Sequence, residues 1–420
     1  MRLLWITNIK VECSDNPNFR GGWMTSALNY LLDNTDYEII IAYPNGKNNF
    51  DNYSIKYVSF FYDLSRTKYD ENLYNQFLNI YTEYQPDIIH IWGTEYLHTY
   101  AAIKAAKKIQ LIDKLVVHIQ GLVSVYSKHY ALGIPEKYQK AKTLLDIISG
   151  SSLKNQIKIF YKRGINEQLA LKNVQYVIGR TSWDKACVEQ INPSIKYLFC
   201  DEIMRPIFYS SDKWEQSKCE RNSIFISQAN RSIKGFHFMV EALNIIKRHY
   251  PDVKVYVAGG GMFNKKGGMS FINTHLRINT YNKYLYQKIC QYGLHEHIVF
   301  LGTLSAVQMR EHYLKANVFV NASTIENSCN SVIEAMLLGV PVVSSYVGGI
   351  TDIIVHKKDG ILYPCDEPYM LAYYIMDIFQ DINLAERLSC NAREKTMRRY
   401  DPKTVGTMLV NIYNSFDKIH

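Results

Sequence analysis

Short apolar runs recur along the whole chain, separated by stretches long enough to hold a helix. Most runs are near-continuous in Val, Ile and Leu rather than alternating, which is typical of strands covered on both faces. In the first half they are Leu3–Thr7, Glu38–Tyr43, Lys56–Phe60, Asp87–Trp92, Lys114–Ile119 and Tyr176–Gly179. In the second half they are Ser223–Ser227, Lys254–Ala258, Ile298–Gly302, Val318–Asn321, Pro341–Ser344 and Gly360–Tyr363. Because intervening stretches such as Tyr96–Ile109 and Phe238–His249 have helical spacing, the sequence predicts parallel sheets wound by helices.

The number of runs indicates two sheets. Twelve strands are too many for one comfortable open sheet, and they suit two Rossmann-like sheets. The pattern lapses at Cys200–Ser217, where Pro206 and a charged, serine-containing run indicate a linker. We therefore expect an α/β protein with an N-terminal domain of residues 1–205 and a C-terminal domain of residues 206–395. In doubly wound sheets ligands bind beyond the carboxyl ends of the strands, so the loops there are where chemistry is expected.

Composition excludes several classes of protein. Hydrophobic residues make up 47% of the chain and charged residues 21%, which is ordinary for a chain that buries a core. No apolar run approaches the roughly 18 residues that span a bilayer, and the start MRLLWIT is too short in apolar residues for a signal peptide. The eight cysteines are scattered without a C-x-x-C pair, which argues against a disulfide framework and a zinc site. The expected compartment is a reducing cytoplasm.

The net charge of +9 is unevenly distributed. Ser124–Lys172 holds nine basic residues and three acidic ones, an excess of six, and it contains tyrosines and a phenylalanine. This combination favours contact with an anionic membrane surface and with a lipid-pyrophosphate acceptor. A solvated helix face is the plain alternative, and no nucleic-acid-binding motif accompanies the charge.

The most informative segment follows the expected strand Val318–Asn321 and reads ASTIENSCNSVIEAMLLGVPVVSSYVGG. Asn330 or Ser331 is a natural N-cap, and the Gly-x-Pro that follows is a natural stop, so we expect a helix over Ser331–Leu338. A helix N-terminus aims its N–H groups outward and favours an anion such as a phosphate.

Two glutamates bracket that N-terminus. Glu326 lies in the loop at the strand end, and Glu334 lies about one turn into the helix. Carboxylates suit hydroxyl-rich groups, so a phosphate flanked by polyols, as in a sugar nucleotide, fits the arrangement. A capped surface helix with two solvated glutamates is the alternative interpretation.

The segment resembles the retaining glycosyltransferases of family 4, which have the GT-B fold. Their signature E-x7-E, A-M-x-x-G-x-P-V-V and G-G is matched at Glu326, Glu334, Ala335, Met336, Gly339, Pro341, Val342, Val343, Gly348 and Gly349. The string IENSCNS looks like the branch that builds bacterial capsular and exopolysaccharides. The resemblance implies two Rossmann-like, doubly wound domains that face a deep cleft. It also implies that residues 396–420 form a C-terminal helix that crosses back to the N-terminal domain.

The resemblance assigns roles to the residues of this segment. Glu326 would hydrogen-bond the donor sugar and Glu334 the nucleotide ribose. Asn330 and Ser331 would lend backbone N–H groups to the diphosphate, and Asn327 belongs to the same donor set.

A basic pair precedes this segment in the second half. Lys234 with Gly235 matches the K-G of the family, whereas the usual arginine position holds Ala229 and Arg231 lies two positions later. A departing nucleoside diphosphate develops negative charge that a fixed cation stabilises. We therefore expect Lys234, with Arg231, to act in catalysis and donor binding; a solvated loop charge is the alternative, more so for Arg231.

The first half offers further candidates by resemblance. Gly21 and Gly22 would form the turn that closes on the donor, with an ordinary turn as the alternative. The family often has a histidine near the reacting sugar; that position holds Gln120 here, and His118 lies two residues earlier on the same expected strand face. His118 is therefore the catalytic candidate of the first half, with a buried core histidine as the alternative.

Two more residues in the first half are expected on the acceptor side. Glu95 and His98 lie three residues apart at an expected helix start after Gly93. With Gln120 they form the set of acceptor-side candidates.

These features predict a retaining, hexosyl-type glycosyltransferase of bacterial surface polysaccharide synthesis, peripheral at the inner face of the cell membrane. It would move a sugar from a UDP- or GDP-linked donor to a glycan or lipid-linked glycan. No cofactor or metal is expected, because no D-x-D pair marks a strand end. The alternatives are a sugar-nucleotide epimerase and a catalytically silent sugar-nucleotide-binding or scaffold protein of the same fold.

Overall fold

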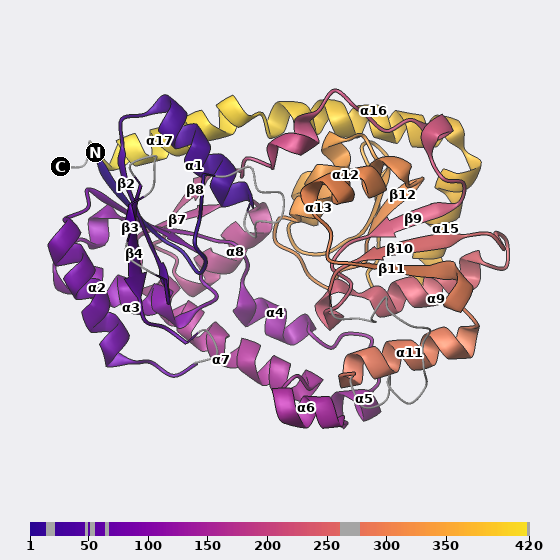
Figure 1. The fold of residues 1–420 in the computed structure, drawn as a ribbon, viewed down its shortest axis with the longest axis horizontal. Helices are drawn as coiled ribbons and strands as arrows, with labels where there is room; N and C mark the ends of the chain where they lie inside the picture. Colours follow the sequence, from indigo (N-terminus) through magenta and orange to yellow (C-terminus); the bar gives the residue numbers. More distant parts are fainter. Residues whose placement is uncertain (14–21, 47–48, 51–54, 64–66, 261–277, 418–420) are drawn as a thin grey trace. The chain divides into compact units, whose positions relative to one another are not determined.

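The computed structural model describes residues 1–13, 22–46, 49–50, 55–63, 67–260 and 278–417. The chain forms two compact units. The first unit contains Met1–Ser127, Ile159–Arg205 and the residues from Arg399 on, and the second contains Lys128–Lys158 and Pro206–Arg398. Each unit is an α/β structure built on its own sheet (Figure 1).

Within the described residues, the first unit has an eight-stranded sheet in the order β3-β4-β2-β1-β5-β6-β7-β8, parallel except for β3. Its strands are β1 (Arg2–Ile6), β2 (Glu38–Pro44), β3 (Asn49–Phe50), β4 (Lys56–Phe60), β5 (Ile88–Trp92), β6 (Leu115–His118), β7 (Tyr176–Gly179) and β8 (Lys196–Phe199). Its helices are α1 (Gly22–Asn34), α2 (Glu71–Tyr84), α3 (Leu97–Lys108), η1 (Ile112–Lys114), α8 (Ser182–Ile191) and α17 (Pro402–Asp417). The chain passes between the units along α4 (Val123–His129) and α7 (Leu153–Lys172).

The second unit, as far as it is described, has a six-stranded parallel sheet in the order β11-β10-β9-β12-β13-β14. Its strands are β9 (Ser223–Ile226), β10 (Lys254–Ala258), β11 (Ile298–Gly302), β12 (Val318–Asn321), β13 (Val342–Ser345) and β14 (Ile361–Tyr363). Its α-helices are α5 (Glu136–Lys140), α6 (Leu144–Ser149), α9 (Phe236–Ile246), α11 (Thr280–Tyr292), α12 (Ala306–Lys315), α13 (Asn330–Leu337), α14 (Ile350–Ile353), α15 (Pro368–Gln380) and α16 (Ile382–Arg399). Its 3-10 helices are η2 (Pro206–Tyr209), η3 (Gln216–Lys218), η4 (Ser232–Lys234) and η5 (His295–His297).

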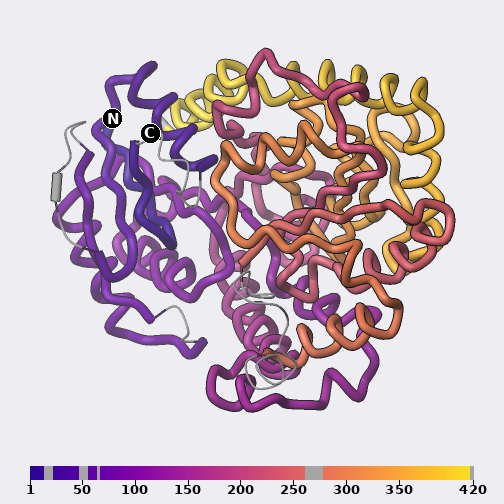
Figure 2. Tube along the Cα trace, turned by 45° about the vertical axis from the view of Figure 1, so that its right-hand side comes forward, coloured from indigo at the N-terminus to yellow at the C-terminus, as the bar shows by residue number. Residues whose placement is uncertain are grey.

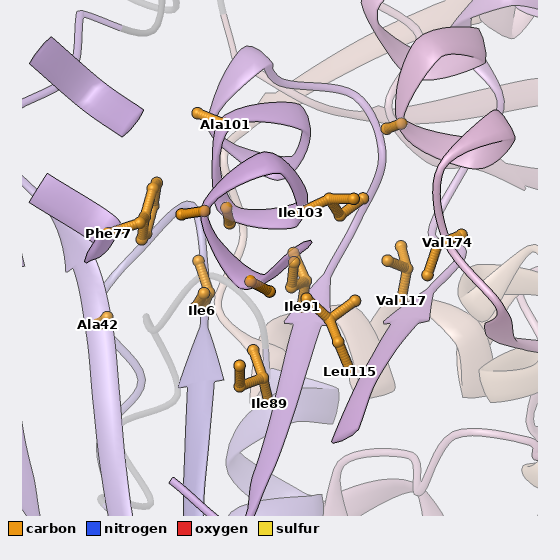
Figure 3. Packing of buried hydrophobic residues seen from close by; sticks show 14 of the residues in the cluster. Ile6, Ala42, Phe77, Ile89, Ile91, Ala101, Ile103, Leu115, Val117 and Val174 are labelled. Atoms are coloured by element: carbon orange, nitrogen blue, oxygen red, sulfur yellow. The ribbon is translucent and has the colours of Figure 1, made fainter. Parts of the chain in front are cut away.

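The continuous apolar runs are explained by burial on both faces of the sheets. In β1, Leu4 and Ile6 belong to one core with α2 and α3 (Figure 3), while Leu3 and Trp5 belong to a second core with α1 and α17. Side chains alternate between the faces of a strand, so a strand buried on both faces must be apolar at every position.

Each of the twelve predicted strands is present, and β3 and β8 of the described chain are the strands that the pattern missed. β8 is an edge strand whose Lys196 and Phe199 are exposed, so it lacks the apolar signature of the others. In the described part of the chain, no helix has the length and apolar character that a membrane crossing requires.

The expected domain boundaries need one correction. Lys128–Lys158 belongs to the second unit, although residues 1–205 were expected to form one domain. The side chain of Ser232 donates a hydrogen bond to the Tyr130 carbonyl (2.6 Å), and the backbone N–H of Thr280 donates to Asp146 (3.0 Å). These contacts join residues about 100 or more positions apart in the sequence, so a local sequence pattern cannot predict them.

The last helix returns to the first unit. The side chains of α17 pack in the core that contains Trp5, and the Trp5 indole N–H donates to the Tyr413 hydroxyl (3.1 Å). The first strand β1 and the last helix α17 therefore both belong to the first unit (Figure 2).

A buried ion pair in the first unit gives a stability prediction. Arg180 and Glu202 lie 2.7 Å apart, with side chains only 3% and 2% exposed. Replacing Glu202 by Gln would leave a buried guanidinium with less compensation, and we expect the free energy of unfolding to fall by about 3 kcal/mol in urea denaturation.

The control for this prediction is an exposed pair in the same unit. Lys185 and Glu189 lie 3.8 Å apart and are about half exposed. Glu189→Gln should change the free energy of unfolding by less than about 1 kcal/mol. Equal losses for the two variants would contradict the role given to the buried pair.

Candidate functional site

The site in the second unit lies at the point where the strand order of its sheet reverses. From β9 the chain moves to β10 and β11 on one side and later returns to β12 on the other, so β9 and β12 flank the switch point. In doubly wound sheets ligands bind at this point, beyond the carboxyl ends of the strands. The loop after β9 carries Lys234, and the loop after β12 carries Glu326.

A short 3-10 turn fixes Lys234. The turn η4 ends at Lys234, and Gly235 follows with φ +65° before α9 begins. A Cβ atom on Gly235 would lie 1.8 Å from the Ala322 carbonyl oxygen, so only glycine fits here. The Thr324 backbone N–H donates to the Ile233 carbonyl (2.8 Å), which ties the two loops together.

Lys234 and Glu326 form an ion pair. Lys234 Nζ lies 2.5 Å from Glu326 Oε1, and both side chains are largely buried. The Ser323 hydroxyl donates to the same carboxylate oxygen (2.7 Å). Burial by itself lowers the pKa of the Lys234 ammonium, but the adjacent Glu326 carboxylate raises that pKa above its ordinary value. Lys234 therefore stays charged at neutral pH.

The G-G element of the sequence, Gly348 and Gly349, packs against the backbone of Glu326. The Gly349 N–H donates to the Glu326 carbonyl (3.1 Å). Gly348 has φ +49°, and a Cβ atom there would lie 1.9 Å from the same oxygen. The two glycines thus let the backbone after β13 approach the Glu326 loop closely.

Helix α13 begins at Asn330, one residue before the expected start, and its N-cap is Cys329. The expectation of an N-cap at Asn330 or Ser331 is therefore wrong by a residue. The Cys329 side chain makes no capping hydrogen bond, so no side chain competes at that position with an anion for the helix N-terminus. Glu334 is buried one turn along the helix.

Cys329 is a neutral thiol beside the ion pair. Burial first, and then the charge of Glu326, raise its pKa to about 11. Its sulfur lies 3.2 Å from the Ser331 hydroxyl. Asn327, in the same loop, is buried.

Arg231 is placed differently from Lys234. It is exposed at the N-cap of η4, where its side chain makes no capping hydrogen bond. The Lys234 backbone N–H donates to the Arg231 carbonyl (2.9 Å), so the two residues belong to the same turn. The structure therefore brings Lys234, Glu326, Arg231, Asn327 and the start of α13 together.

The strands β1 and β5 flank the switch point of the first sheet, and Glu95 follows β5, whereas His118 and Gln120 lie at the end of the next strand, β6. Gly21 lies outside the described residues, and Gly22 begins α1. Glu95 and Gln120 lie close together, because a Cβ atom on Gly93 would meet both side chains. Burial, and then the charge of Glu167, raise the pKa of Glu95 to about 7.

His98 requires a correction. Its ring is buried and packs against Phe60, Tyr62 and Tyr96 on the face of the sheet that carries the α2 and α3 core. Burial lowers its pKa to about 3. We therefore assign His98 to the core rather than to the acceptor-side set.

His118 is also buried, but it borders a small cavity. Its ring stacks on Trp92 (4.6 Å between centroids), its strand neighbour across β5 and β6. Burial, followed by the charges of His90 and Arg180, lowers its pKa well below the ordinary range. The cavity of about 10 Å³ is also lined by Trp23 and Glu202. His118 is neutral there, and its catalytic role stays a prediction.

Ser323 and Cys329 contact the ion pair or flank it, and the sequence analysis did not single them out. Ser323 is the second residue after β12 and orients the Glu326 carboxylate. A polar residue directly after a strand at the switch point is a signal that could have identified it. Cys329 lies inside the recognised string but carries no motif of its own.

Residues 210–395 match the model of the family described as Glycosyl transferases group 1. The match lies within the second unit and contains Lys234, Glu326 and Glu334. This part of the chain therefore carries a glycosyltransferase group 1 domain.

Curated relatives are similar over part of their length. An uncharacterized glycosyltransferase of Methanocaldococcus jannaschii is 28% identical over 211 residues, which cover 48% of this chain and 49% of that protein. The capsular polysaccharide biosynthesis glycosyltransferase CapM of Staphylococcus aureus is 29% identical over 106 residues, covering 25% of this chain and 28% of that protein. The chain spans about half the length, or less, of these curated relatives.

Solved structures share the fold along the whole chain. Sucrose-phosphate synthase of Thermosynechococcus elongatus has a TM-score of 0.73 at 15% identity and is matched over 100% of both chains. Anabaena HepE in complex with UDP-glucose has a TM-score of 0.67 at 17% identity, over 99% of this chain and 100% of that one. At these identities the likeness shows the fold alone, and the expected α/β fold with two Rossmann-like domains is confirmed.

Proposed function

We propose that the protein is a retaining glycosyltransferase of family 4 that moves a sugar from a nucleotide-diphosphate donor to a glycan or lipid-linked glycan. The observation that carries the proposal is the buried pair of Lys234 and Glu326 beside the N-terminus of α13, at the switch point of the sheet. A cation, a carboxylate and a helix N-terminus are what a sugar diphosphate needs. The group 1 family match over residues 210–395 supports the same class of reaction.

Different residues of the site would bind different groups of the donor. Lys234 carries three N–H donors, and the ion pair with Glu326 uses one of them, which leaves donors for a phosphate oxygen. Arg231 adds charge at the same loop. Asn330 and Ser331 lie at the start of α13, where their backbone N–H groups would bind the diphosphate. Glu326 would accept from sugar hydroxyls and Glu334 from the ribose.

In the proposed step, the bond between the sugar C1 and the diphosphate oxygen breaks, and the electron pair leaves with the diphosphate. The acceptor oxygen forms the new bond on the same face of the sugar, and its proton passes to the departing phosphate. Negative charge grows on the phosphate in the transition state, and a fixed ammonium stabilises it more than it stabilises the ground state. Because Lys234 supplies this charge, we propose that the reaction needs no metal or other cofactor.

The nucleotide of the donor and the biosynthetic process are each proposed from a similar protein. A UDP-linked donor is supported by the complex of the Anabaena neighbour with UDP-glucose, and a GDP-linked donor is the second choice. A place in bacterial surface polysaccharide synthesis is supported by the likeness to the capsular enzyme of Staphylococcus aureus. A nucleotide-sugar donor and a role in polysaccharide synthesis both imply that the protein acts in the cytoplasm. A lipid-linked acceptor would bring it to the inner face of the cell membrane.

The acceptor side is proposed to include Glu95 and Gln120, which lie together beyond β5 and β6. With a pKa of about 7, Glu95 can hydrogen-bond an acceptor hydroxyl in either protonation state at neutral pH. His118 is neutral and buried nearby in the sheet, where it would orient rather than exchange a proton.

The test is release of nucleoside diphosphate from a panel of UDP- and GDP-sugars, with and without a membrane extract as acceptor source. We expect one donor to be used, with release stimulated by extract and unchanged by EDTA. Glu326→Gln should lower this release roughly 100-fold, because the carboxylate that holds the sugar and orients Lys234 is gone.

Glu241→Gln is the matched control, because Glu241 forms another ion pair in the second unit, with Lys288. It should release diphosphate at the wild-type rate. Donor binding without release in any arm would favour the silent binding protein. Conversion of the donor sugar without acceptor would favour the epimerase, and restoration of an EDTA-treated sample by a divalent cation would contradict the metal-independent step.

A further inference from the structure

Helix α6 presents an apolar face to solvent. The side chains of Leu144, Ile147 and Ile148 are 57%, 65% and 84% exposed. They occupy half of a six-residue helix, so they form one continuous patch rather than scattered single residues. A surface helix ordinarily turns such residues toward the core.

The polar side of α6 is the side that is held. Thr143 and Asp146 form a capping box at its start. The Asp146 carboxylate, which is buried, also accepts from the backbone N–H of Thr280 (3.0 Å) and from the Thr280 hydroxyl at the start of α11. These bonds fix the helix with its carboxylate inward and its aliphatic side chains outward.

The end of α6 is fixed as well. Gly150 ends the helix with φ +67°, and Asn155 Nδ2 donates to its carbonyl (2.6 Å). The helix is therefore braced at both ends, and its exposed face does not result from a loose segment.

A basic pocket adjoins the start of this helix. It has a volume of about 210 Å³ and is lined by residues of α5, of α11 and of the turn before α6. Its lining residues include three lysines and no carboxylate; they are Lys137, Tyr138, Ala141, Lys142, Thr143, Thr280, Lys283 and Gln287. Among the residues that the structure describes, no carboxylate forms an ion pair with Lys137, Lys142 or Lys283.

The pocket is shaped by contacts between its walls. The Tyr138 hydroxyl of α5 donates to Gln287 of α11 (2.5 Å). The Thr280 hydroxyl also lies 3.3 Å from the Ala141 carbonyl. Three lysines therefore line one pocket, and such a concentration of positive charge favours an anion such as a phosphate.

We propose that α6 and this lysine pocket together form a docking surface for an anionic lipid bilayer, with the aliphatic side chains inserted and a lipid phosphate in the pocket. Apolar side chains flanked by lysines are typical of elements that lie in the membrane interface. Charge selects this partner over a second copy of the chain, because a symmetric contact would set lysines against lysines.

Neither Tyr130 nor Tyr138 is placed to insert into the bilayer. Tyr130 is buried, and Tyr138 is engaged with Gln287. The aliphatic residues of α6 take the role that the sequence analysis gave to the tyrosines. The surface belongs to the second unit and is distinct from the donor site, so the proposal does not rest on glycosyl transfer.

The experiment is vesicle flotation of the full chain with phosphatidylcholine vesicles, with and without phosphatidylglycerol. Wild type should bind the anionic vesicles at least roughly tenfold more tightly than the neutral ones. Affinity for the anionic vesicles should fall roughly tenfold or more in each of two variants. These are Ile147→Asp/Ile148→Asp and Lys137→Gln/Lys142→Gln/Lys283→Gln. Ile382→Asp, an exposed isoleucine of α16 in the same unit, should bind as wild type does.

Two readouts keep the result interpretable. Thermal unfolding of each variant shows that it is folded, since exposed side chains contribute little to the core. Release of diphosphate in the absence of vesicles should be unchanged, which separates failure of this proposal from failure of the glycosyltransferase proposal. Equal binding to neutral and anionic vesicles, or a wild-type dimer that Ile147→Asp/Ile148→Asp converts to a monomer without any vesicle binding, would overturn the lipid assignment.

Discussion

Lys234→Met is expected to lower the rate of diphosphate release by roughly 100- to 1000-fold, the cost of removing one preorganised charge from a developing oxyanion. The methionine fills similar space but carries no charge. The effect should appear in kcat, because the lost interaction is strongest in the transition state. Steady-state kinetics with the donor identified from the panel would measure it.

The ion pair complicates this variant, because it leaves the Glu326 carboxylate without its ammonium partner. The double variant Lys234→Met/Glu326→Gln removes both charges and should recover stability without recovering activity. Lys234→Arg keeps the charge but changes the geometry, so partial activity is expected. Recovery of full activity in the double variant would show that Lys234 only neutralises Glu326.

Lys288→Met is the matched control, since Lys288 pairs with Glu241 in the same unit. Its kcat should stay near the wild-type value while its stability falls slightly. A comparable loss of kcat in Lys288→Met would mean that disturbance of the unit, rather than loss of the Lys234 charge, explains the result.

Gly235→Ala is the second change with a large expected effect. The new Cβ would meet the Ala322 carbonyl at 1.8 Å, and both partners are backbone-anchored. The Phe238 N–H also donates to the Gly235 carbonyl (2.9 Å), so the turn cannot simply swing away from α9. We expect the free energy of unfolding to fall by roughly 3 kcal/mol. We also expect kcat to fall roughly 100-fold, because Lys234 must move with the turn.

Gly302→Ala separates the clash from the backbone preference. Gly302, at the end of β11, has φ +74°, but a Cβ atom there would meet nothing within 4 Å. The free energy of unfolding of this variant should fall by only about 1 kcal/mol, which is the cost of an alanine in the left-handed conformation, and its kcat should not change. Equal stability losses in urea denaturation of the two variants would show that the contact with Ala322 relaxes without cost.

Most of the strands that the sequence identified are buried on both faces, as β1 shows. The four buried positions of β1 must all be apolar, because Leu4 and Ile6 face one core and Leu3 and Trp5 face the other. β8 was missed because an edge strand with exposed Lys196 and Phe199 lacks that requirement. The half-buried edge strand β11 was still identified, because its run IVFLG is apolar throughout. The local pattern therefore detects apolar runs, and it misses an edge strand such as β8 whose exposed ends interrupt the run.

His98 shows the same limit in the candidate site. Its position three residues after Glu95 suggested a shared surface, but α3 turns the imidazole into an aromatic core. Spacing alone does not state which face of a helix is covered, because the covering residues Phe60 and Tyr62 come from β4 and the loop after it. Ser323 was overlooked for the converse reason, since its role depends on where Glu326 lies in space.

The sequence by itself determined the two parallel sheets, the string that carries Glu326 and Glu334, and the basic turn at Lys234, because each depends on residues close together in the chain. Only the tertiary structure decided that Lys234 pairs with Glu326, that Lys128–Lys158 packs with the second unit, and that α6 turns its aliphatic face outward. These facts depend on contacts across roughly 100 residues or more, and such contacts form only when the chain has folded.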